Sequence, residues 1–358
     1  MCSNLRSWLV ALMGVVLLAG GQAGLAEPYI SVRSGQPCHA CHSNGTGGGM
    51  RTAFGGTYAV NVLSVRPMLD ESIDPEFAIA DGFRLGGNAR YSARQFESDS
   101  VDGNLDFSTD RVSLYGHLQP NPVVDLYIDQ QVAPGGSLNR EAWARVSRDQ
   151  WYLKGGKFFL PYGWRLEDDS AYVRQATGIN FTTPDNGLEL GYEGAALQAQ
   201  VSVTNGAGGG SEVDDGKFFL ARVNWLGKWG QLGANAGFND SDNGERSLIG
   251  LTAGWNTGPV AWLLEYDRIV DSIDGADDEE QDLALCEANW LVIRGHNLKF
   301  TAEWQNPDLG EERSRGSFVW EYFPWSYTQL RAGIRVQRSD NPLFMEGEEY
   351  FVQAHIYF

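Results

Sequence analysis

Two cysteines and a histidine near the N-terminus are the residues whose types and spacing could do chemistry. Cys38, Cys41 and His42 form the pattern C-x-x-C-H, which is the attachment pattern of c-type haem. The two thiols can bond the two vinyl groups of one porphyrin, and the next residue brings an imidazole to the iron. The sequence therefore predicts one covalent haem c, with thioether bonds at Cys38 and Cys41 and His42 as proximal iron ligand. No separate catalytic residue is predicted.

Two other kinds of site share part of this pattern. A thioredoxin-like dithiol normally opens a helix in a βαβ unit, whereas residues 43–49 here are loop-forming. A zinc site needs a second ligand pair at suitable spacing, and none follows. Haem attachment is therefore the favoured interpretation.

The first 26 residues have the organisation of a secretory signal peptide. Arg6 supplies a basic region, residues 8–19 an apolar region, and residues 24–26 a cleavage site of small residues. The mature chain is expected to begin near Glu27, in a compartment where disulfides can form. Of the four cysteines, Cys2 would leave with the signal, and the odd number that stays is no disulfide framework.

Residues 27–81 form the predicted monohaem segment. They contain too few apolar residues to bury a haem alone, because small domains build marginal cores. The haem is therefore expected to take part of its walls from residues 82–358.

Residues 82–358 are predicted to form an all-β, antiparallel outer-membrane barrel of about sixteen strands. From Phe83 onward, segments of about ten residues alternate apolar and polar side chains between turn signals. The chain ends on Phe358, as outer-membrane barrels commonly do; a soluble sandwich or lipocalin-like barrel is the alternative. The predicted strands begin near Phe83, Asp110, Val123, Arg140, Gln150, Gly187, Ala196, Lys217, Gly230, Ser247, Val260, Asp282, Asn297, Arg313, Tyr327 and Glu348.

Short connections alternate with long acidic ones along this region. Short turns of such barrels lie in the periplasm, so both chain ends and the haem segment are expected there or in the lumen. The densest acidic loop, residues 271–282, would face outside, either as a solvated loop or as a cluster that attracts cations. The formal net charge of −19 argues against nucleic acid as a partner.

Alternation assigns a face to each strand residue. Trp262, Leu264 and Tyr266 should face lipid, and Glu265 and Asp267 the lumen. Cys286 should also point to lipid. Seven arginines fall on lumen faces, where they could hold haem propionates or bind anions, although pairing with lumen carboxylates is expected for most: Arg84, Arg90, Arg94, Arg111, Arg222, Arg331 and Arg335.

The sixth ligand of the haem iron is expected among three side chains. His117 and His355 fall on lumen faces near the short-turn ends of their strands, whereas His296 falls in a turn and is less suited. Met50 is close in sequence, and methionine is a known haem ligand. The candidates are therefore His117, His355 or Met50, with water or an open position as the alternative.

Two stretches carry a family resemblance. Residues 36–42, followed by Ala53, Phe54 and Gly55, resemble the N-terminus of porin-cytochrome fusions that include the iron-oxidising outer-membrane cytochromes. Residues 156–166 are similar to a segment of phosphate-selective-type porins. Gly56 and the glycine insert at residues 47–49 depart from the iron-oxidiser pattern, so the resemblance leaves the direction of electron flow open.

The resemblance implies electron transfer across a bacterial outer membrane through one haem held in a porin-like barrel. A periplasmic electron-transfer cytochrome would be the inner partner, and an external donor or acceptor, Fe(II) among the candidates, the outer one. The protein would then be an electron-transfer cytochrome rather than a conventional enzyme. The alternatives are a solute porin with a haem-bearing plug and a peroxidase-like haem enzyme.

Overall fold

The computed structural model describes residues 27–66, 77–98, 103–212, 214–242, 244–273, 275, 277–307, 312–340 and 346–358. The predicted signal peptide lies outside the described residues. Among these residues there are four short helices, α2 (Pro28–Ser34), α3 (Cys38–Cys41), α4 (Ala53–Tyr58) and α5 (Tyr172–Thr177), and the π-helix η1 (Ala59–Leu63) continues α4. None of the described helices is long and apolar enough to cross a membrane.

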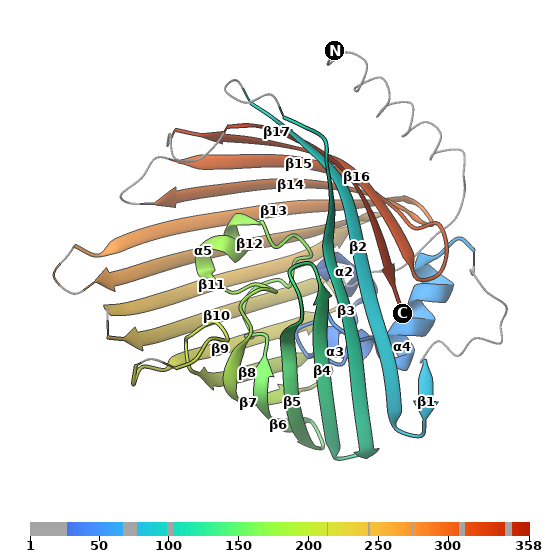
Figure 1. Cartoon of the computed structure of the whole chain (residues 1–358), viewed down its shortest axis with the longest axis vertical. Helices are drawn as coiled ribbons and strands as arrows, with labels where there is room; N and C mark the ends of the chain where they lie inside the picture. The colour runs from blue at the N-terminus through green and yellow to red at the C-terminus, as the bar shows by residue number, and fades with distance from the viewer. Residues whose placement is uncertain are drawn as a thin grey trace.

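Sixteen antiparallel strands, β2 to β17, form a closed barrel (Figure 1). Each strand pairs with the next along the chain, and β17 pairs with β2, which closes the ring. The short strand β1 (Ala78–Ala80) pairs with the start of β2. The barrel strands are β2 (Phe83–Glu97), β3 (Asp106–Asn121), β4 (Val124–Ala133), β5 (Leu138–Arg148), β6 (Trp151–Phe158), β7 (Asp185–Glu193), β8 (Leu197–Thr204), β9 (Phe218–Gly227), β10 (Gly230–Ser241), β11 (Gly244–Thr257), β12 (Val260–Ile273), β13 (Glu279–Ile293), β14 (His296–Pro307), β15 (Arg313–Tyr322), β16 (Thr328–Ser339) and β17 (Gly347–Tyr357). The predicted number of strands is confirmed, and every predicted start lies within four residues of an observed one.

The two faces of the barrel wall have opposite chemistry. On β12, Leu264 and Tyr266 are 36% and 43% exposed on the outside, whereas Glu265 and Asp267 are buried inside. A soluble barrel would bury its apolar face, so this inverted arrangement identifies a membrane-spanning one. Large exposed apolar side chains recur around the exterior, including Leu126, Val146, Leu153, Leu190, Val201, Phe219, Val223, Leu232, Ile249, Leu251 and Phe300.

The connections at the two ends of the barrel differ. Tight turns join β7 to β8, β9 to β10, β11 to β12 and β13 to β14 at one end, here called the turn end. At the opposite loop end, residues 159–184 and 205–217 make longer connections, but β4 and β5 are joined by residues 134–137 only. The predicted asymmetry is therefore present but incomplete.

The prediction of an acidic loop at residues 271–282 is wrong. Strands β12 and β13 continue through most of this segment, with Asp271 paired opposite Glu279. Two arginines reduce the repulsion between these carboxylates, because Arg268 contacts Glu280 and Asp282, and Arg246 lies 3.5 Å from Asp271. The segment is a partly neutralised hairpin rather than a free anionic loop.

Within residues 27–66, here called the plug, α2 and α3 lie inside the barrel near its turn end, and α4 lies at that end (Figure 1). Polar groups of the plug bond to lumen-facing side chains on several sectors of the wall, so the plug is fixed from more than one side. The bonds include Lys299 Nζ to Glu27 Oε1 at 2.7 Å, Tyr29 Oη to Glu321 Oε2 at 3.0 Å, Gln231 Nε2 to Ser31 Oγ at 2.7 Å, Asn256 Nδ2 to Val32 O at 2.8 Å, and Asn44 Nδ2 to Glu141 Oε1 at 2.9 Å.

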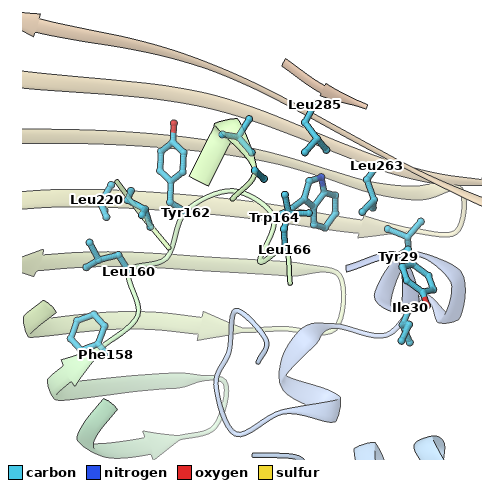
Figure 2. Close-up of a cluster of buried hydrophobic side chains, with 14 of the residues drawn as sticks. Tyr29, Ile30, Phe158, Leu160, Tyr162, Trp164, Leu166, Leu220, Leu263 and Leu285 are labelled. Carbon is cyan, nitrogen blue, oxygen red and sulfur yellow. The ribbon is translucent and has the colours of Figure 1, made fainter. Parts of the chain in front are cut away.

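Residues 159–184, here called the inserted loop, enter the lumen from the loop end and include α5. Figure 2 shows Leu160, Tyr162 and Trp164 running along the inner wall from Phe158 toward the plug. Two main-chain amides bond to wall carboxylates: Trp164 N donates to Glu265 at 3.0 Å, and Tyr172 N donates to Glu303 at 2.7 Å. The loop is therefore a structured part of the interior.

Two acidic side chains fasten the inserted loop to arginines of the wall. Glu167 lies 3.2 Å from Arg90, and Asp168 lies 2.8 Å from Arg335 and 3.3 Å from Arg315. Burial alone would raise the pKa of both carboxyls, but the arginines outweigh it and hold each pKa well below its usual value. A depressed carboxyl pKa stabilises the docked loop above the usual pKa, and this contribution is lost as the pH falls.

Placing a charge on the lipid face should destabilise the barrel in a depth-dependent way. Leu251→Arg, in the middle of β11, is expected to lower the free energy of unfolding in lipid vesicles by about 2–4 kcal/mol, whereas Trp229→Arg at the turn end should cost at most about 1 kcal/mol. Denaturant titration in vesicles measures both. Equal, negligible effects would contradict the lipid-facing assignment of β11.

Removing one loop carboxylate should loosen the inserted loop at neutral pH. Asp168→Asn loses its pairing with Arg315 and Arg335, so amide exchange at Trp164 and Tyr172 should accelerate roughly ten- to a hundredfold, as expected for charged hydrogen bonds worth about 1.5–3 kcal/mol. In the unaltered protein the same protection should fall as the pH drops below the usual carboxyl value of 4.5. Hydrogen exchange with mass spectrometry tests both, with the exposed Asp278→Asn as control; unchanged protection in Asp168→Asn would refute the ion-pair anchor.

Candidate functional site

The two cysteines and the histidine of the motif share one turn of the plug. The helix α3 begins at Cys38 and ends at Cys41. His42 follows in extended conformation, and its main-chain N–H donates to Cys38 O at 3.0 Å. Both thiols are free. The local geometry thus presents two thiols and an imidazole from five consecutive residues.

Three consecutive glycines close the loop after the motif. Gly47, Gly48 and Gly49 all have positive φ, which side-chain-bearing residues rarely adopt. A Cβ on Gly49 would lie 2.5 Å from Tyr127 Oη of the wall, and one on Gly47 would touch Cys38. The glycine insert that departs from the iron-oxidiser pattern is therefore required by the backbone of this loop.

A further glycine brings α4 against the motif. A Cβ on Gly55 would collide with the main-chain carbonyl of Cys41. Thr52 caps this helix by accepting a bond from Gly55 N at 3.2 Å, and it also donates to Ala40 O at 2.6 Å. The stretch around Ala53 and Gly55 therefore packs directly on the back of α3.

Cys38, Cys41 and His42 all line one cavity. Plug, inserted loop and barrel wall all contribute residues to its lining. The cavity is therefore formed partly by residues 82–358, as expected. The other lining residues are Glu27, Pro28, Ile30, Ser31, Ser34, Gln36, Pro37, Thr46, Gly47, Gly48, Arg51, Gly55, Tyr58, Ala59, Leu63, Trp164, Arg165 and Arg222.

The protonation states of the three motif side chains follow from their burial. Burial raises the pKa of the Cys38 thiol, and it raises the pKa of Cys41 to about 11. Burial, aided by Arg51, lowers the pKa of His42 to about 3, so its imidazole is neutral, the form that binds metals. His42 Nδ1 is buried and has no hydrogen-bond partner among the described residues. These features fit a covalently attached haem, which would be held by both thiols and by the imidazole.

The predicted sixth ligands do not line this cavity. His117 is engaged elsewhere, with Nε2 3.1 Å from Asp125 Oδ1 and Nδ1 against Arg84. His355 is buried 3.7 Å from Glu167 and lines a neighbouring cavity of about 500 Å³. Met50 packs near Gly86 of the wall. Main-chain pairing brings Met50 close to the motif, because Ser43 N donates to Met50 O at 3.0 Å, but none of the three lines the cavity that His42 lines. The sixth ligand therefore stays a prediction.

The lumen arginines mainly pair with carboxylates, as expected. Arg90 and Arg331 flank Glu167, Arg111 lies 2.9 Å from Asp169, and Arg335 bridges Asp168 and Glu349. Arg94 contacts Asp110 and Glu349. Arg84 instead contacts His117, and Arg222 donates to Gln200 at 3.2 Å.

The inserted loop was missed by the sequence interpretation, which treated residues 156–166 only as a barrel signature. In the structure β6 ends at Phe158 and the following residues leave the wall for the lumen. One signal was present: residues 159–184 are too long for a tight turn and carry Phe159, Tyr162 and Trp164, which are too apolar for an exposed loop. Two of the loop's residues, Trp164 and Arg165, line the cavity.

Comparison with solved structures identifies the fold. A scan of protein-family models and a search of curated proteins gave no match. A loop-deletion mutant of OmpT, an outer membrane protein of Vibrio cholerae, aligns with a TM-score of 0.63 at 14% identity, over 77% of this chain and 99% of that one. An anion-selective porin from Comamonas acidovorans aligns with a TM-score of 0.60 at 11% identity, over 77% and 98% of the two chains. The part of this chain left uncovered is about as long as the segment that precedes the barrel, and the chain has the fold of the outer-membrane porins.

Proposed function

We propose that this protein transfers electrons across the bacterial outer membrane through a single haem c attached at Cys38 and Cys41 and ligated by His42. The observation that carries the proposal is that all three side chains line one cavity inside a membrane-spanning barrel. A haem bound there supplies one-electron redox chemistry. The residues of the chain hold it, keep its proximal ligand neutral and surround it with walls from three parts of the fold.

The filled lumen supports this proposal over an open channel. Lumen-facing side chains of four strands, Gln198, Asn289, Glu321 and Gln329, have no exposed surface. In a water-filled porin such side chains would line the aqueous path and be exposed. The plug contacts two of these residues, since Tyr29 donates to Glu321 and Arg33 donates to the main-chain carbonyl of Asn289. Solutes would meet packed protein there, whereas electrons do not need an open path.

A solute porin with a haem-bearing plug is the second candidate, and the fold likeness favours it. Each of the solved structures described above is an outer-membrane protein, one of them an anion-selective porin. The plug would then have to move for solutes to pass. A peroxidase-like enzyme is the third candidate, since the described lining of the cavity offers no second histidine and no methionine.

The partners follow from the proposed position of the haem. The turn end is assigned to the periplasm, where a periplasmic electron-transfer cytochrome would exchange electrons with the plug. An external donor or acceptor, Fe(II) among the candidates, would exchange electrons at the loop end. The inserted loop spans the distance between that end and the cavity.

Covalent attachment can be tested on a denaturing gel. Cys38→Ala combined with Cys41→Ala should abolish haem staining of the protein band, because both thioether bonds are lost. Cys286→Ala, which changes a thiol on β13 away from the cavity, should stain as the unaltered protein does. Staining that survives the double change would refute the assignment.

Electron transfer is tested in sealed liposomes that enclose an electron acceptor. The unaltered protein should pass electrons from an external donor to the enclosed acceptor without leakage of a small solute, and the Cys38, Cys41 double variant should not. Solute leakage through the unaltered protein without electron transfer would support the porin instead. Rapid turnover of peroxide would support the enzyme.

A further inference from the structure

Arg165 is a half-buried arginine whose guanidinium pairs with no carboxylate among the described residues. Its guanidinium lies 4.0 Å from the ring centre of Phe159 and 4.6 Å from that of Phe181. Nη1 donates to Thr46 Oγ1 of the plug at 3.3 Å. Nε and Nη2 are buried and donate to no acceptor among the residues that the structure describes.

Other arginines of the interior show what is usual in this lumen. Arg174, on the same loop, contacts Glu265, and Arg315 lies 2.7 Å from Glu303. Arg165 instead faces rings and a hydroxyl, and its burial lowers its pKa to about 10 although Glu141 and Asp169 act in the opposite direction. Burying cationic nitrogens is costly unless they are paired and hydrogen-bonded, so Nε and Nη2 of this arginine call for an anion that the barrel itself does not supply.

The cavity that Arg165 lines is the one that holds the thiols and the imidazole. Two further arginines line it, Arg51 from the plug and Arg222 from β9. The carboxylate in the lining, Glu27, is engaged by Lys299 at 2.7 Å. The cavity thus has a surplus of positive charge, contributed by plug, inserted loop and wall, and this surplus suits a ligand that carries carboxylates.

We propose that Arg165 binds a propionate carboxylate of the haem attached at Cys38 and Cys41, with Arg222 as a second donor. This inference rests on the proposed function. Haem carries two propionates, and an arginine with two unused N–H groups is suited to bidentate carboxylate binding. The consequence is that the inserted loop is held by the cofactor at one side and by the wall at the other, through Trp164 and Glu265.

The test uses the intact, haem-loaded protein and two readouts other than activity. Arg165→Gln should shift the propionate bending bands in the resonance Raman spectrum and lower the midpoint potential, because an unpaired carboxylate beside the iron favours the oxidised state. Arg165→Lys keeps the charge but not the bidentate fork, so it should restore most of the potential while the bands stay shifted. A merely structural role would not be rescued in this way.

Arg313→Gln is the matched control, because Arg313 also lies on an aromatic ring, 4.2 Å from the centre of Tyr172, but does not line the cavity. It should leave both readouts unchanged. Covalent haem with unaltered bands and potential in Arg165→Gln would overturn this inference and leave the proposed function standing. Absence of covalent haem from the unaltered protein would overturn both.

Discussion

Lipid cannot hydrogen-bond the backbone, and the structure depends on this constraint. A sheet that spans a membrane must satisfy every main-chain N–H and C=O by pairing strands, so its edges must meet. Here β17 pairs with β2 along ten consecutive residues, from Glu348 opposite Glu97 to Tyr357 opposite Asn88. In the closed barrel the polar faces of the strands point inward. The polar interior can be filled only by groups that form hydrogen bonds and ion pairs with it.

The plug and the inserted loop meet that demand from opposite ends. Glu321 on β15 accepts a hydrogen bond from the hydroxyl of Tyr29 in the plug, and Glu265 on β12 accepts one from the main-chain amide of Trp164 in the inserted loop. Lys299 on β14 forms an ion pair with Glu27, and Arg335 on β16 forms one with Asp168. Charges on the wall and charges on the two inserted segments are thus paired, and this pairing fixes both segments together with the apolar cluster that contains Tyr29, Trp164 and Leu263.

Local patterns made the barrel and the motif predictable, whereas contacts across the lumen were not. Alternation along β12 gives the faces of Leu264 and Glu265 because a strand side chain has two directions only. The C-x-x-C-H motif is complete within five residues. The position of Glu27 against Lys299, or of Arg165 beside Thr46, depends on which strands and inserted segments face one another inside a closed ring. Periodicity carries no such information, so the side chains around His42 could not be found from the sequence, and the inserted loop was indicated only by its length and its aromatic residues.

The enclosure of α3 has a consequence for the order of assembly. Cys38 and Cys41 lie on a helix surrounded by a ring of hydrogen-bonded strands, and Tyr127 and Glu141 hold the loop that follows it. An enzyme that modifies these thiols is too large to enter such a ring. Enzymatic modification of the two cysteines must therefore precede closure of the barrel, so that the N-terminal segment is modified first and the strands then fold around it.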